Sequence, residues 1–303
     1  MQKKKTMATV AALTAQVIFG FSFMFTKIAL QYATPMTVIA DRYLVAFTSL
    51  TIVMLIKGIK IQAGKNSSKL LLMALFQPVL YFLCESYGIQ LTTSGFSSVM
   101  IALIPVISIF GGMLFLKEVP SPLQVGFTCV SVLGVVQMAY NGKMDGTVTA
   151  LGILLLLGAV LSSVAYNVLS RKLSGEFTAF ERTYAMMATG LLVFLVLAWG
   201  EHTHNPAEIV SSFRYPLYTF SILYLGVVSS VIAFLLLNYA NTYLPVSKTT
   251  VFSNITTLVS VTAGIIFLEE PFGVVTVISS LMIVGGVWGA QRAKQPAITE
   301  KEV

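Results

Sequence analysis

The sequence has very little charge. Aspartate, glutamate, lysine and arginine make up only 10% of its 303 residues, whereas an ordinary soluble domain carries about 25%. A chain this poor in charge cannot cover a soluble fold with a wettable surface. Hydrophobic residues make up 56% of the chain, and they occur in blocks of about 20 residues, the length that crosses the hydrocarbon core of a bilayer. The sequence therefore predicts an all-α, polytopic membrane protein surrounded by a lipid bilayer.

Cysteine and histidine are also scarce. Cys84 and Cys129 both fall inside apolar blocks, which argues against a disulfide framework. His202 and His204 both lie in one polar connection, a predicted outside loop, so neither can serve a metal or proton relay in the core. The sequence contains no His-Glu-x-x-His motif, no Gly-x-Ser-x-Gly elbow and no phosphate-binding loop. We therefore expect no catalytic site, no metal site and no cofactor, and predict that the protein is not an enzyme.

Ten apolar blocks are separated by charged or turn-forming residues. They lie near 7–31, 35–56, 70–91, 95–116, 121–140, 148–170, 179–200, 215–240, 246–268 and 272–291. The connections are short, the longest being 201–214, so there is no room for a soluble domain. The sequence predicts ten transmembrane helices.

The basic residues predict how the chain is oriented. If the N-terminus lies in the cytoplasm, ten spans leave only Lys143 and Arg214 in outside loops. The inside segments then hold Lys3, Lys4, Lys5, Lys57, Lys60, Lys65, Lys69, Lys117, Arg171, Lys172, Arg182, Lys248, Arg292, Lys294 and Lys301. This asymmetry is typical of a multi-pass protein of the plasma or inner membrane with both termini cytoplasmic. It also accounts for the net charge of +7 without a nucleic-acid partner.

The two halves of the chain resemble each other. Residues 115–118 read Phe-Leu-Lys-Glu and residues 267–270 read Phe-Leu-Glu-Glu, and the same offset of 152 positions relates Gly134 to Gly286. Since each half has an odd number of spans, the second must be inverted in the membrane relative to the first, as in many secondary transporters. The predicted units are a five-helix repeat at 1–142, a second five-helix repeat at 143–294 and a cytoplasmic tail at 295–303.

Several short motifs resemble a known family. They are Gly20-Phe21-Ser22-Phe23 with Lys27, Pro35 followed by Arg42, Phe-Leu-Glu-Glu-Pro at 267–271, and Gly285-Gly286-Val287. With them the chain resembles the ten-helix, EamA-type members of the drug/metabolite transporter superfamily over nearly its whole length. It differs at Phe19, where the family usually has tryptophan. The resemblance implies a transporter of small molecules, with amino acids or related compounds as one class.

Four ionisable residues stand out within the predicted spans: Lys27, Asp41, Arg42 and Glu85. Each costs roughly 2.5–3.5 kcal/mol to insert in hydrocarbon, so each needs a partner or a water-filled cavity. One interpretation is a structural ion-pair cluster that joins the first three helices, with Lys27 reaching to the interface. The other is functional, with Glu85 as a protonatable carboxylate and Arg42 as its neighbour or as the contact for an anionic substrate group. Asp41 and Arg42 are adjacent, so they must point about 100° apart.

Other polar and aromatic residues recur at helical spacing in spans 1, 3, 6, 8 and 9. They line a substrate pathway in one interpretation and form ordinary interhelical hydrogen bonds in the other. The candidate pathway residues are Lys27, Arg42, Glu85, Gln16, Phe23, Tyr81, Tyr166, Asn167, Asn238 and Asn254. Spans 5 and 10 carry few polar residues, so we expect them at the periphery.

The sequence thus predicts a secondary active transporter that exports small metabolites by alternating access, with protons as a candidate coupling ion. A passive channel or facilitator, or a membrane subunit of a complex, remains an alternative. Gly285 and Gly289 form a small-residue pair at the spacing that lets helices approach closely. This pair leaves both a monomer and a homodimer open.

Overall fold

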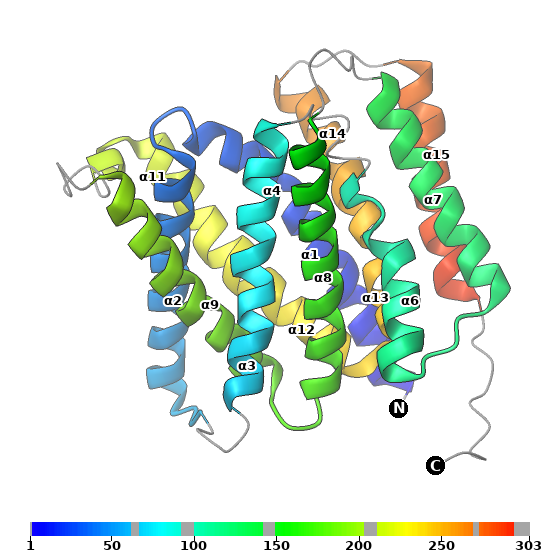
Figure 1. The fold of residues 1–303 in the computed structure, drawn as a ribbon, viewed down its shortest axis with the longest axis horizontal. Helices are drawn as coiled ribbons and strands as arrows, with labels where there is room; N and C mark the ends of the chain where they lie inside the picture. Colours follow the sequence, from blue (N-terminus) through cyan, green and yellow to red (C-terminus); the bar gives the residue numbers. More distant parts are fainter. Residues whose placement is uncertain are drawn as a thin grey trace.

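A computed structural model describes residues 2–61, 67–91, 100–141, 149–202, 211–268 and 273–293. Within these ranges the regular secondary structure is entirely helical, which confirms the predicted all-α class. Figure 1 shows the helices packed side by side as one bundle, most of them running along a common direction. Six of the described helical segments are long and apolar enough to cross a membrane, and Ile104–Leu116 and Pro122–Gln137 are shorter apolar segments.

The first half of the chain supplies the first five predicted spans. Its elements are α1 (Gln2–Ala29), α2 (Pro35–Lys57), α3 (Ser67–Ala74), η1 (Leu75–Leu80), α4 (Tyr81–Gln90), α6 (Ile104–Leu116) and α7 (Pro122–Asn141). The third span is bent, because Gln77 leaves helical geometry with φ −143° and ψ 117° inside the π-helical segment η1. Pro78, which has no N–H for the helix ladder, follows directly.

The second half supplies the other five spans. Its elements are α8 (Ala150–Leu173), α9 (Ala179–Glu201), η2 (Ser212–Arg214), α11 (Pro216–Leu223), η3 (Tyr224–Ile232), α12 (Ala233–Tyr243), α13 (Val246–Thr250), α14 (Ser253–Leu268) and α15 (Val274–Arg292). The eighth span, α11–η3–α12, contains a second π-helical segment. The repeat offset of 152 places 75–80 on 227–232, inside η3. Both repeats are therefore interrupted at the same place, and such π-helical segments are frequent at functional sites.

Two threonine caps fix where α2 and α9 begin. Thr34 Oγ1 accepts a hydrogen bond from the Thr37 N–H. Thr178 Oγ1 accepts from the Glu181 N–H, and Glu181 Oε2 in return accepts from the Thr178 N–H at 2.8 Å. Such caps satisfy N–H groups that have no partner within the helix. They set the register of the two helices that carry the most deeply buried arginines of the described structure.

Spans 5 and 10 pack closely on each other. A Cβ added to Gly286 would lie 2.6 Å from the Ser131 backbone nitrogen, and one added to Gly289 would lie 2.3 Å from the Phe127 ring. Only glycine permits this approach of α15 to α7, and Figure 1 shows the two helices side by side at one edge of the bundle. The close pair is therefore Gly286 and Gly289. A Cβ added to Gly285, which we expected to take part, would meet no atom within 4 Å.

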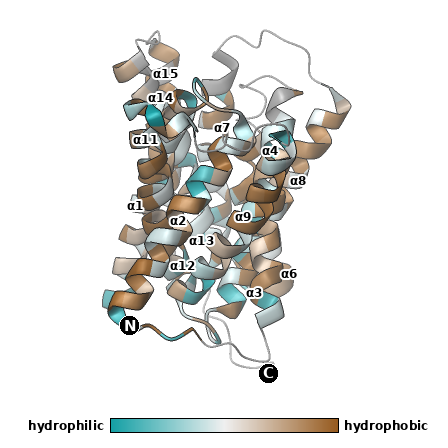
Figure 2. Ribbon diagram, turned by 90° about the vertical axis from the view of Figure 1, so that its left-hand side faces the viewer, coloured by the Kyte–Doolittle hydropathy of each residue, from teal (hydrophilic) through white to brown (hydrophobic). Residues whose placement is uncertain are grey.

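The helix surfaces are strongly apolar. Figure 2 shows hydrophobic residues along most of the length of the helices. Leu114 is 75% exposed and Ile56 is 79% exposed, which would be costly in water but suits contact with lipid. The outer surface thus agrees with a membrane environment.

Both chain ends of the described structure lie at one end of the bundle, which we call the basic end. Here α1 begins and α15 ends (Figure 1). The Lys4 ammonium lies 5.6 Å from the centre of the Tyr243 ring at the end of α12. Lys248 Nζ donates to the backbone oxygens of Gln291 and Ala293.

The opposite end of the bundle carries the start of α2 and the end of α9. His202 Nε2 lies 2.9 Å from Thr37 Oγ1, and the Thr34 hydroxyl donates to Glu201 Oε2 at 2.7 Å. His202 is therefore engaged with α2. His204 lies outside the described residues.

Candidate functional site

Arg42 is the centre of a polar cluster between α1, α2 and the eighth span. Its Nε donates to Ser230 Oγ at 2.6 Å, and its Nη2 donates to Ser229 Oγ at 3.1 Å. The Ser22 hydroxyl, from α1, donates to Ser229 Oγ at 2.7 Å. The guanidinium carbon lies 5.2 Å from the centre of the Phe82 ring. The segment η3 thus supplies both hydroxyls that hold the guanidinium.

Arg42 keeps hydrogen-bonding capacity in reserve. A guanidinium has five N–H donors, and the described residues accept from only Nε and Nη2. No carboxylate of the described structure forms an ion pair with it. Its side chain is only 7% exposed, so the charge is largely removed from solvent. A largely buried cation with unused donors favours an anionic group as its further partner.

Asp41 points to a different part of the eighth span. Its Oδ2 accepts a hydrogen bond of 2.6 Å from the Tyr218 hydroxyl in α11. Its Oδ1 is buried and has no hydrogen-bond partner among the described residues. Asp41 therefore contacts α11, whereas Arg42 contacts η3, the next segment of the same eighth span.

Glu85 and Tyr81 lie one helical turn apart on α4. The Tyr81 hydroxyl donates to Glu85 Oε1 at 2.8 Å, and both side chains are half-buried. The Tyr81 ring centre lies 5.4 Å from that of Phe82, the ring that also lies against Arg42. Lys27 is exposed on α1. An arginine, a carboxylate and aromatic rings are thus brought together around Phe82.

A second buried arginine, Arg182, was not among the predicted site residues. Its Nη1 donates to the backbone oxygen and Oγ of Ser170 at 2.6 and 2.7 Å. Its Nη2 donates to the Asn238 backbone oxygen at 2.9 Å and to Thr242 Oγ1 at 2.5 Å. Its Nε donates to the Thr178 backbone oxygen at 3.4 Å. All five donors are used and the side chain is fully buried, so Arg182 ties α8, α9 and α12 together.

Three predicted site residues belong to this second cluster. Asn238 Oδ1 accepts hydrogen bonds from the Tyr166 hydroxyl at 3.1 Å and from Ser170 Oγ at 2.7 Å. Asn167 Oδ1 accepts from Asn241 Nδ2 at 3.1 Å. All are buried. The interhelical interpretation describes their contacts, because these donors and acceptors face each other across α8 and α12.

The remaining predicted residues lie elsewhere. Gln16 Oε1 accepts from Thr256 Oγ1 at 2.8 Å, which joins α1 to α14. Asn254 Nδ2 donates to Ser131 Oγ at 2.9 Å, which joins α14 to α7. The side chain of Phe23 lies outside the described residues. The structure therefore separates the predicted residues into an Arg42 group, an Arg182 group and single helix-to-helix contacts.

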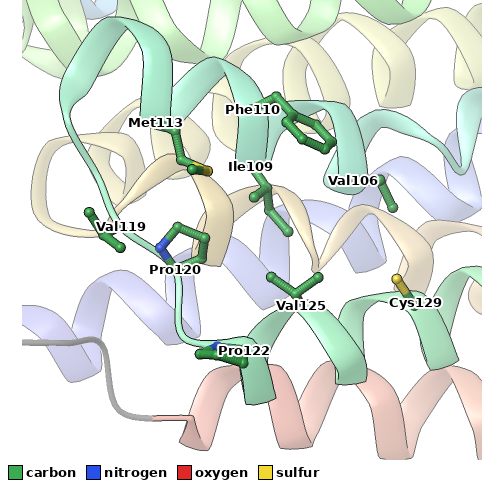
Figure 3. A pocket seen from close by; sticks show the side chains of 9 residues that line it. All are labelled: Val106, Ile109, Phe110, Met113, Val119, Pro120, Pro122, Val125 and Cys129. Atoms are coloured by element: carbon green, nitrogen blue, oxygen red, sulfur yellow. The ribbon is translucent and has the colours of Figure 1, made fainter.

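A hollow of about 420 Å³ in the described structure has an almost entirely apolar wall. It lies between α6 and α7 and is lined by Val106, Ile109, Phe110, Met113, Val119, Pro120, Pro122, Val125 and Cys129 (Figure 3). Such a wall suits lipid chains and gives a polar metabolite no orienting contact. No group of three or more potential metal ligands occurs in the described part of the chain.

Comparisons with known proteins agree with this architecture. The profile of the EamA-like transporter family matches the chain twice, over residues 6–140 and 150–290. "Uncharacterized transporter YcxC" from Bacillus subtilis (strain 168) is 32% identical over 313 residues and covers 100% of both chains. A "Probable terminal-alkyne amino-acid exporter" from Streptantibioticus cattleyicolor is 26% identical over 210 residues, covering 69% of this chain and 66% of the relative.

A solved crystal structure of a protein has the same fold. Its TM-score is 0.80 at 16% sequence identity, and the match covers 95% of this chain and 99% of the other. The double family match fits the predicted ten-helix, two-repeat membrane protein. Because one family profile accounts for most of both halves, the chain belongs to the EamA-like transporter family and is a transporter rather than an enzyme.

Proposed function

We propose that the protein is a secondary active exporter of small carboxylate-bearing metabolites, amino acids or related compounds. The observation that carries the proposal is the unused hydrogen-bonding capacity of Arg42, a largely buried cation that forms no salt bridge with a carboxylate of the described structure. A substrate carboxylate at Nη1 would form charge-assisted hydrogen bonds and neutralise the buried charge. Ser229 and Ser230 hold the guanidinium in the orientation for this contact.

The neighbours of Arg42 suit the rest of an amino acid. The half-buried Glu85 lies on α4, one turn beyond Phe82, and its carboxylate can accept from a substrate ammonium group. The Phe82 ring offers an apolar face between the two charged groups. One relative carries the name of an amino-acid exporter, which supports the same substrate class.

Transport would proceed by alternating access between the two inverted repeats, with the basic end in the cytoplasm. The excess of lysine and arginine at that end supports this orientation. Protons are the proposed coupling ion, and Glu85 is their proposed carrier. A proton on Glu85 and a substrate ammonium at Glu85 exclude each other, which is the competition that a proton-substrate exchanger needs.

The first experiment tests the carboxylate contact by thermal stabilisation of the purified protein. The ligands are hydrophobic amino acids, the corresponding decarboxylated amines and the methyl esters. We expect stabilisation by the free acids alone, and loss of this stabilisation in Arg42→Gln. Removing the charged hydrogen bonds should weaken the free energy of binding by about 2–3 kcal/mol, which raises Kd roughly 50-fold.

Arg214→Gln is the matched control. Arg214 also lies against an aromatic ring, 4.9 Å from the centre of the Tyr215 ring, but it is exposed. Its replacement should leave the ligand response intact. Equal stabilisation by acids and amines, or an unchanged response of Arg42→Gln, would contradict the carboxylate site. If the rate of substrate flux into vesicles does not depend on an imposed pH gradient, the protein is instead a passive facilitator.

A further inference from the structure

The loop after α6 carries an unusual turn. Lys117 ends the helix in the left-handed region with φ 54°, which a non-glycine residue adopts only where its surroundings enforce it. The next N–H, of Glu118, donates to the Gly112 backbone oxygen at 3.1 Å. A Cβ added to Gly112 would lie 3.2 Å from Glu118 Oε2. The turn therefore folds the Glu118 side chain back over the end of α6.

Glu118 reaches from the first repeat to two elements of the second. Its Oε2 accepts a hydrogen bond of 2.8 Å from the backbone N–H of Val246, the first residue of α13. The preceding residue, Pro245, makes no side-chain cap for that helix. The other carboxylate oxygen of Glu118, Oε1, lies 3.4 Å from Arg171 Nε at the end of α8. Glu118 thus supplies the missing N-terminal cap of α13 while it pairs with Arg171.

Arg171 performs the complementary task for α12. Its Nη1 donates to the backbone oxygens of Asn241 at 3.3 Å and of Thr242. These residues belong to the last turn of α12, whose carbonyls have no partner further along the helix. The ion pair therefore caps both sides of the helix break between α12 and α13.

We infer that the Glu118–Arg171 pair is a latch that closes the transport pathway at the basic end and opens when that end admits substrate. The inference rests on the proposed alternating access. The pair joins the two repeats, so a movement of one repeat against the other must stretch or break it. The side chains of Arg171 and Glu118 are 29% and 11% exposed, so solvent screens the pair less than it screens a surface ion pair.

The latch lies next to an apolar cluster that also contacts Tyr81. Ile104, Val168 and Val246 pack together there, and Tyr81 packs against them. Val246 is the residue whose N–H Glu118 holds. Release of Glu118 would free the start of α13 and with it one wall of this cluster, against which Tyr81 of the Tyr81–Glu85 pair packs.

A second ion pair offers a matched control. Lys69 Nζ lies 3.2 Å from Glu176 Oε1, and this pair also joins α3 of the first repeat to the loop after α8. Its side chains are 48% and 42% exposed, and exposed pairs contribute little. If any contact between the repeats closed the pathway, both pairs would matter; the latch requires that only Glu118–Arg171 does.

The test measures how fast a membrane-impermeant maleimide labels Val168→Cys in vesicles of known orientation. Cys84 and Cys129 are first replaced by alanine, so that position 168 carries the reporter. We expect slow labelling in this background. Glu118→Gln and Arg171→Gln should each raise the rate about tenfold, equivalent to about 1.4 kcal/mol, from the basic end only. Glu176→Gln should leave it unchanged.

The outcomes separate the latch from the transport proposal. An unchanged labelling rate in Glu118→Gln and in Arg171→Gln overturns the latch, whether or not the protein transports substrate. Faster labelling from both membrane faces, with a fall in thermal midpoint, shows a merely structural pair and also overturns it. Faster labelling from the basic end in a protein that moves no amino acid keeps the latch and overturns the proposed substrate class.

Discussion

The two buried arginines should respond to mutation in opposite ways. Arg182 places all five of its donors on protein oxygens, three of them in buried hydrogen bonds, whereas Arg42 donates to only two serine hydroxyls. Replacing either by methionine removes a buried charge and its hydrogen bonds. The difference lies in what remains, because each buried acceptor that loses its donor costs about 1–3 kcal/mol.

For Arg182 most of the acceptors that lose a donor lie on α8 and α12. A donor is lost by the backbone oxygen and the hydroxyl of Ser170, by the Asn238 backbone oxygen and by the Thr242 hydroxyl. A backbone oxygen inside a helix keeps its hydrogen bond within that helix. We expect a loss of about 3 kcal/mol in the free energy of unfolding, within the range found when buried charged networks are broken. For Arg42 the serines keep the bond from Ser22 to Ser229. There we expect a change below about 1 kcal/mol, because an incompletely paired cation is removed as well.

The assay is equilibrium unfolding in mixed detergent micelles, followed by circular dichroism, for wild type, Arg42→Met and Arg182→Met. Ligand stabilisation is measured in parallel on the same preparations. Arg182→Met should lower the unfolding midpoint, while Arg42→Met should keep the midpoint and lose the ligand response. A loss of stability in Arg42→Met as large as that in Arg182→Met would refute the distinction between a saturated and an unsaturated arginine.

Three further predictions follow from single contacts. Glu85→Gln should abolish flux driven by a pH gradient and spare substrate exchange in proteoliposomes; unchanged gradient-driven flux would remove Glu85 from coupling. Burial raises the pKa of the Glu118 carboxyl, and the Val246 N–H and Arg171 oppose this shift only in part. Since a raised acid pKa stabilises the fold at low pH, the thermal midpoint of wild type relative to Glu118→Gln should fall as the pH rises from about 4 through that pKa, and a difference independent of pH would contradict it. Gly289→Ala should cost about 1–3 kcal/mol of stability through overpacking against α7, whereas Gly285→Ala should be neutral in the same denaturation assay; equal effects would place the contact elsewhere.

Much of the fold could be predicted because the bilayer sets the length of each span. The helix breaks were harder. Pro245 marks the break between α12 and α13 in the sequence, but nothing as plain marks η3, whose apolar residues continue those of its neighbours. Within η3, Gly226 lies against α2, where an added Cβ would lie 2.6 Å from Val45 Cγ1. Such a contact between distant positions cannot be seen from periodicity.

The charged residue at the centre of the site could be predicted from the sequence, whereas its hydrogen-bond partners could not. The cost of an arginine in hydrocarbon singled out Arg42, while its serine partners lie almost two hundred positions away. The distribution of basic residues predicts that Arg182 lies in a cytoplasmic segment, although it falls within the predicted span 179–200. The Thr178–Glu181 capping box would have placed it inside the first turn of α9.

The two interruptions occupy equivalent positions, yet they carry different chemistry. At the repeat offset, Ser229 and Ser230 of η3 correspond to Gln77 and Pro78 of η1. The hydroxyl oxygens of the two serines accept hydrogen bonds from Arg42, whereas Gln77 Oε1 is buried without a hydrogen-bond partner in the described structure. One repeat therefore orients a cation and the other retains an unused acceptor. Under the proposed alternating access, a symmetric pair of helix breaks with unequal polar content would let the halves move alike while the substrate is held in one orientation.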